Sequence, residues 1–147
     1  MKKPVRSRVR KGKSKTRVAD YLPLIQQSFY RGKPIRNLDH SLYAVGNDSL
    51  LIQATKPDAD HFFFGINAEL IRKASEVMLI CVRSDDGLIV FRIPSAELLA
   101  CKMNMDPERM RYLPTVKYDR KRRKWCLTLK KTEAGSTLDI DRYRLRA

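Results

Sequence analysis

The sequence of 147 residues lacks the patterns that identify a disulfide scaffold or a membrane protein. It contains three cysteines and no CxxC pair, so we expect reduced thiols and a cytoplasmic location. No apolar run approaches the roughly 18 residues that a membrane-spanning helix needs, and we expect no membrane partner. The basic N-terminus is not followed by an apolar segment and a cleavage site, so we do not expect a secretory signal.

Motifs for metals and cofactors are also missing. The two histidines, His40 and His61, do not have metal-ligand spacing with a cysteine or a carboxylate, which argues against a zinc site. Neither GxGxxG nor GxxxxGK(S/T) occurs, so no nucleotide cofactor is indicated. We therefore expect no cofactor, except Mg²⁺ if the chain is a metal-dependent nuclease.

Acidic residues are scarce: 16 Asp and Glu stand against 31 Lys and Arg, for a formal net charge of +15. Nine basic residues precede the first acidic one, Asp20. Such a block repels itself unless it meets water or a polyanion, so we expect residues 1–17 to form a disordered tail that follows phosphates. A solvated tail without a ligand is the alternative. The tail residues predicted to bind nucleic acid are Arg6, Arg8, Arg10, Lys11, Lys13, Lys15 and Arg17.

A second basic block, residues 117–124, lies between two apolar stretches and is predicted to form the tip of a β-hairpin. Tight turns present several charges together, and a basic hairpin can lie along or enter a groove of nucleic acid. Tyr118 and Trp125 flank the tip, where they either stack on bases or support the loop. In the alternative, Trp125 belongs to the core and the charges only protect a sheet edge. The predicted contact residues are Lys117, Arg120, Lys121, Arg122, Arg123, Lys124 and Trp125.

The order of predicted elements indicates an α+β fold, with a mixed, mainly antiparallel sheet and flanking helices in one domain over residues 18–147. Apolar periodicity and caps predict helices over 20–31, 67–75, 95–101 and 137–145. Alternating or continuous apolar runs predict strands over 41–45, 49–55, 61–66, 77–82, 88–93, 112–118 and 124–129. We expect the first three strands to form an antiparallel meander, and Phe62 and Phe64 to share one face in the core.

The strings SLLIQATK (49–56), FFFGI (62–66), VMLICV (77–82) and IVFRIP (89–94) follow one another within residues 20–100. This stretch resembles the restriction-endonuclease-like superfamily of PD-(D/E)XK nucleases. The resemblance implies metal-dependent DNA cleavage in restriction or genome defence. The catalytic residues that it implies are Asp39, Asp48, Gln53 and Lys56. The motif is degenerate, because Thr55 stands where the family has a lysine, two residues after Gln53.

The basic tail and hairpin together predict a protein that binds nucleic acid by neutralising phosphates, with double-stranded DNA favoured. A Mg²⁺-dependent endonuclease of the restriction type is the first alternative. The second is an RNA-binding or assembly module whose tail enters structured RNA. A homo-oligomer or a larger complex is compatible with the sequence.

Overall fold

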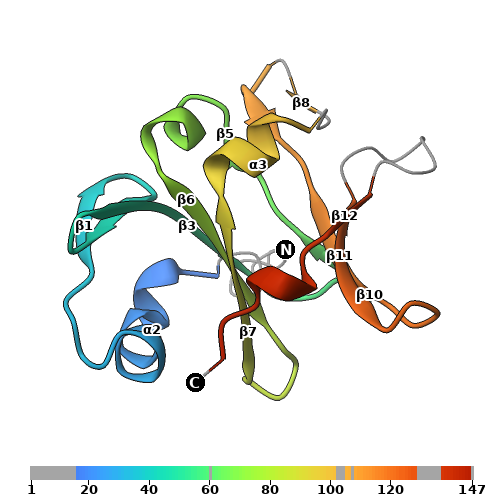
Figure 1. The fold of residues 1–147 in the computed structure, drawn as a ribbon, viewed down its shortest axis with the longest axis horizontal. Coiled ribbons are helices and arrows are strands. Elements are labelled where there is room, and N and C mark those ends of the chain that lie inside the picture. Colours follow the sequence, from blue (N-terminus) through green and yellow to red (C-terminus); the bar gives the residue numbers. More distant parts are fainter. Residues whose placement is uncertain (1–15, 60, 102–104, 107, 129–136, 147) are drawn as a thin grey trace, which may run out of the picture.

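The computed structural model describes residues 16–59, 61–101, 105–106, 108–128 and 137–146. The predicted basic tail lies outside the described residues, except for positions 16 and 17. The fold is α+β as predicted, with mainly antiparallel strands and short helices (Figure 1). Within the described ranges, no helix is long and apolar enough to cross a membrane.

The central sheet has five strands in the order β1-β2-β3-β6-β7. Neighbouring strands run antiparallel, except that β3 and β6 are parallel. The connection from β3 to β6 therefore has to cross from one end of the sheet to the other, and it contains strands of the other two sheets. The central strands are β1 (Arg36–Asp39), β2 (Leu42–Val45), β3 (Asp48–Thr55), β6 (Glu76–Val82) and β7 (Leu88–Pro94).

Strand alternation along β6 divides the apolar core into two clusters. The odd-numbered residues from Val77 to Cys81 face the second sheet, and the even-numbered residues from Met78 to Val82 face helix α2 (Leu22–Phe29). All six side chains are buried, as predicted for a continuous apolar run covered on both faces. The central sheet thus lies between α2 on one side and β10 to β12 on the other (Figure 1).

The second sheet has the order β12-β11-β10-β4, and its inner face supplies Phe62, Val116 and Leu127 to the core. The third, smaller sheet has the order β5-β9-β8. The strands of the second sheet are β4 (His61–Phe63), β10 (Thr115–Asp119), β11 (Lys124–Thr128) and β12 (Thr137–Asp139), and those of the third are β5 (Ile66–Asn67), β8 (Met105–Asp106) and β9 (Arg111–Tyr112). The remaining elements are α3 (Ser95–Leu99) and the 3₁₀ turns η2 (Val18–Asp20), η3 (Leu70–Lys73) and η4 (Asp141–Tyr143).

The prediction of a third meander strand over 61–66 is wrong. The predicted strand is interrupted at Phe64 and Gly65, so its first part becomes β4 and its last part becomes β5, which belong to different sheets. β4 pairs with β10, whose residues lie about 50 positions later, so local periodicity carried no information about the partner. The expected alternation is confirmed, because Phe62 and Phe64 are buried whereas Phe63 is exposed. Strand β1, on the edge of the central sheet, was not predicted.

The predicted helix over 137–145 is also wrong. Residues 137–139 form β12 beside β11, and only a 3₁₀ turn follows. The chain then crosses to the central sheet, where the Leu145 amide donates to the Val90 carbonyl at 2.8 Å. Pairing with two sheet edges satisfies backbone groups that a helix would have paired internally. The predicted helix over 67–75 is reduced to η3, although Asn67 Oδ1 accepts from the Glu69 and Leu70 amides as a cap does.

Candidate nucleic-acid interface

The β10–β11 hairpin places the second basic block at an exposed tip. Tyr118 pairs with Trp125 and Asp119 with Lys124, so the turn consists of residues 120–123. All four turn side chains, which are Arg or Lys, are exposed. Among the described residues, no ion pair involves these four side chains. Their positive charge therefore faces solvent at one end of the second sheet.

Asp119 fixes the shape of this turn. Its Oδ1 accepts hydrogen bonds from the Lys121 amide at 3.0 Å and the Arg122 amide at 3.2 Å. Arg123 closes the turn in the left-handed region, with φ of 55°. An aspartate that holds its own following amides is a common turn device, and here it leaves the basic side chains free to point outward. An acidic residue thus organises a basic surface.

Lys124 differs from the other basic residues of the block because it has an acidic partner. Its Nζ lies 3.1 Å from Asp139 Oδ2 on the neighbouring strand β12. The backbone amide of Asp141 donates to Asp139 Oδ1, and this bond, with help from Lys124, holds the pKa of Asp139 below its ordinary value. Lys117 is exposed on the same outer face, opposite Cys126. Burial raises the pKa of the Cys126 thiol, which Arg122 partly offsets.

Trp125 packs against the core and is also partly exposed, so its position is compatible with both of the roles that the sequence left open. It is half-buried, and its ring centroid lies 5.8 Å from that of Phe91 and 6.3 Å from that of Phe62. Tyr118 covers its outer side in an edge-to-face contact at 5.4 Å and is itself 43% exposed. The indole therefore joins the core at one edge and reaches the surface at the other.

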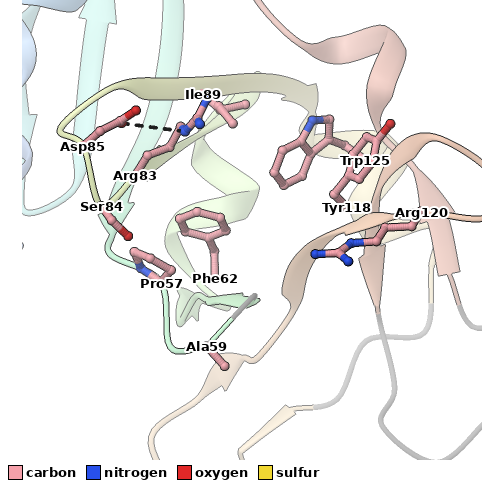
Figure 2. Close-up of a pocket in the computed structure, with 10 residues that line it drawn as sticks. All are labelled: Pro57, Ala59, Phe62, Arg83, Ser84, Asp85, Ile89, Tyr118, Arg120 and Trp125. Atoms are coloured by element: carbon pink, nitrogen blue, oxygen red, sulfur yellow. Dashed lines mark ion pairs between the residues drawn. The ribbon is translucent and has the colours of Figure 1, made fainter.

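A cleft of about 510 Å³ opens beside this aromatic pair. Its volume is within the usual range for small-ligand sites. Figure 2 shows Trp125, Tyr118 and Arg120 on one wall, with Phe62 between them and the opposite wall. Three turns form the rim: the segment after β3, the β6–β7 turn and the β10–β11 hairpin. The lining residues are Pro57, Ala59, Phe62, Arg83, Ser84, Asp85, Ile89, Tyr118, Arg120 and Trp125.

Two arginines from different turns face this cleft. Arg120 extends from the hairpin, and Arg83 lies across from it beside the β6–β7 turn (Figure 2). Arg83 Nε is 3.7 Å from Asp85 Oδ1, and both side chains are more than half exposed, so water screens this pair. Sequence reasoning missed Arg83 because it lies 37 positions before Arg120 in an ordinary hairpin turn.

The structure does not bring the four predicted catalytic residues together. Asp48 and Gln53 are five positions apart on β3, so their side chains lie on opposite faces of the central sheet. Asp48 is on the α2 side, where its Oδ2 accepts from Arg92 Nη2 at 2.9 Å. Arg92 also donates to Glu76 and to the Tyr30 hydroxyl, and these bonds outweigh partial burial and raise the pKa of Arg92. Asp48 is thus part of an ion-pair cluster that joins α2 to the sheet.

Asp39 and Gln53 do share a second cleft, of about 480 Å³, on the opposite face. Gln53 Nε2 donates to Ser41 Oγ at 3.3 Å, and Glu69 and Lys73 line the same cleft. Lys56 follows the end of β3 and directly precedes Pro57 of the first cleft. Within the part of the chain that the structure describes, no group of three or more His, Cys, Asp or Glu is placed to hold a metal ion. The four residues that the nuclease resemblance implies therefore do not form a single Mg²⁺ site, although Asp39 and Gln53 line the same cleft.

Comparisons with known proteins provide no relative for this chain. No family model, curated protein or solved structure matches it. The geometry of the hairpin and of the cleft beside it is therefore the basis for the functional inference.

Proposed function

We propose that this protein binds nucleic acid, with double-stranded DNA favoured, and that the β10–β11 hairpin is its folded contact surface. The main observation that supports this proposal is the exposed basic turn of four residues, whose backbone is held by hydrogen bonds to Asp119. The block from Lys117 to Lys124 and its neighbour Asp139 contain six basic and two acidic side chains. This excess of positive charge is concentrated around one hairpin, where it can neutralise phosphates.

The turn explains why the hairpin suits a phosphate surface better than an unstructured basic run. Its backbone is preorganised, so fewer conformations are lost when the side chains meet the duplex. Arg side chains donate to phosphate in a fixed fork geometry. The predicted basic tail would add affinity and reach, because it contributes charge without a fixed shape.

The test is the salt dependence of duplex binding by the full chain and by two charge-matched variants. Each contacted phosphate contributes about −0.9 to the slope of log affinity against log salt concentration. The triple change Arg120→Gln, Lys121→Gln and Arg122→Gln should therefore flatten the slope by about 2 to 3. The control is Arg31→Gln, Lys33→Gln and Arg36→Gln, which removes the same charge from exposed residues of the α2–β1 connection and the first position of β1.

The control variant should leave the slope close to that of the unmodified chain, although overall affinity falls slightly with net charge. Equal flattening in the two variants would show that binding follows net charge and does not use the hairpin. A slope near zero for the unmodified chain would refute nucleic-acid binding itself. In the same assay, structured RNA that outcompetes duplex DNA at equal salt would favour the RNA-binding alternative.

A nuclease acting at the second cleft is the alternative that one observation favours. Asp39 and Gln53, which the resemblance to restriction-type nucleases picked out, line that cleft together. This alternative predicts cutting of supercoiled or linear DNA with Mg²⁺ or Mn²⁺ that is lost in Asp39→Ala. Asp48→Asn should leave such cutting unchanged, because that carboxylate faces the other side of the sheet. Intact substrates with both metals would exclude it.

A further inference from the structure

We propose that the cleft beside Trp125 receives an unpaired base of the bound DNA. This inference rests on the proposed function, because the hairpin that holds the phosphates also forms one wall of the cleft. The site would select nucleic acid with an unstacked base over a perfect duplex. It adds a structure preference to a surface whose charges alone recognise only phosphates.

The cleft has the chemistry of a base-binding site. Its aromatic side chains come from β4, β10 and β11, and Phe62, Trp125 and Tyr118 lie around the space that Figure 2 shows. Bases stack on aromatic rings whatever their sequence, because every base has a π-face. Tyr118 is the accessible ring of the three, whereas Phe62 is buried at 5% exposure.

Polar groups sit at the rim opposite the aromatic wall. Ser84 and Asp85 lie in the β6–β7 turn, and the Gly87 amide donates to Asp85 Oδ1 at 2.9 Å, which fixes that carboxylate. A hydroxyl and a carboxylate at this place can hydrogen-bond the edge of a base whose faces are stacked. The pairing of an apolar wall with a few fixed polar groups is typical of small-ligand sites.

The charges around the cleft suit the backbone that must accompany a base. Arg83 and Arg120 approach the cleft from two separate turns, so each can contact a phosphate on either side of an extruded nucleotide (Figure 2). A base within a duplex cannot reach a cleft, and only an unpaired or extruded base can enter. The remaining turn charges, Lys121 to Arg123, would lie along the flanking duplex.

Trp125 allows a direct test, because it is the only tryptophan of the chain and lines the cleft. The full chain is titrated with three DNA duplexes of equal length: fully paired, with one bulged adenine, and with an abasic bulge. We expect the bulged adenine to quench Trp125 fluorescence and to bind tighter than the other two. Equal quenching by the abasic bulge, which carries the same phosphates, would overturn the inference.

Tyr118→Ala separates stacking from charge, with Tyr118→Phe as the control that keeps the ring. Loss of one stacking partner should weaken binding of the bulged adenine about 5- to 150-fold. It should weaken binding of the fully paired duplex much less than binding of the bulged adenine, and the control should resemble the unmodified chain. Far-ultraviolet circular dichroism checks that the variant is folded, which we expect because Tyr118 is an exposed side chain.

The outcomes distinguish the cleft from the hairpin. If Tyr118→Ala weakens both duplexes equally, the cleft inference fails while salt-dependent binding by the hairpin stands. If no duplex binds with salt dependence, the proposed function fails first. An RNA bulge that binds and quenches more strongly than the DNA bulge would overturn the assignment to DNA.

Discussion

Asp119 gives the sharpest test of whether the shape of the basic turn matters. Replacing it with Ala removes the oxygen that accepts from the Lys121 and Arg122 amides. Replacing it with Asn keeps an oxygen at the same place. Both changes remove the same negative charge, so the two variants have the same net charge and differ in the turn contacts.

The expected size of the effect on DNA affinity follows from the two hydrogen bonds that Asp119 accepts. Removing a side chain that caps backbone amides in this way costs about 0.5–2 kcal/mol of local stability. In Asp119→Ala the turn is no longer held closed. If bound DNA requires the closed turn, closing it on binding costs about 1 kcal/mol of binding free energy, which weakens the affinity about fivefold. Asp119→Ala should therefore bind duplex DNA several-fold more weakly than Asp119→Asn, although simple electrostatics predicts equal and tighter binding for both.

Two measurements check this reasoning. Fluorescence anisotropy with a labelled duplex at about 0.1 M salt, where exposed charges are partly screened, gives the two affinities. Amide hydrogen exchange at Lys121 and Arg122 should be faster in Asp119→Ala and near the unmodified rate in Asp119→Asn. Equal affinities despite different exchange rates would refute the idea that the fixed turn contributes to binding.

Three further predictions concern stability. Phe91→Ala removes a fully buried ring against Trp125 and should cost about 3–5 kcal/mol in urea unfolding, and a cost below about 1 kcal/mol would contradict the packing of the two sheets. Glu76→Gln should destabilise more than Asp48→Asn, because their side chains are 26% and 56% exposed, and denaturant midpoints in the reverse order would contradict this. The folded pKa of Asp139 lies below its ordinary 3.8, so its stabilising contribution is present above that pH and is lost as the pH falls through the folded pKa. Asp139→Asn should therefore be less stable than the unmodified chain at pH 7, and urea unfolding should show the gap closing as the pH falls below the ordinary pKa of the carboxyl.

Local sequence patterns correctly predicted the strand that is buried on both faces and the hairpins that have tight turns. The run from Val77 to Val82 is apolar at every position, so it could only be covered on both faces. The β6–β7 hairpin follows from Asp86-Gly87, where Asp86 takes a φ of 68°. The basic tip at 120–123 was also predicted, because charges between two apolar stretches can only lie at a solvent-facing turn.

The candidate site was predicted only in part, because its residues meet through contacts between distant segments. Trp125 and Arg120 were predicted from their place at the hairpin, whereas Arg83 and Pro57 come from turns that carry no basic or aromatic pattern. The resemblance to nucleases grouped four residues by their order along the chain. Asp48 and Gln53 are separated because they stand at an even and an odd position of β3, so the side chain of Asp48 lies on the α2 side of the sheet and that of Gln53 on the other.

The sequence by itself determined the net charge of the chain, the strand over 77–82 that is covered on both faces and the placement of the basic block at a hairpin tip. These properties depend on residues that are near one another along the chain, where periodicity and turn chemistry act. Only the tertiary structure decided that β4 pairs with β10 and that three turns enclose a cleft beside Trp125. Sheet pairing joins segments that are far apart in sequence, and the choice among partners depends on packing of the whole core.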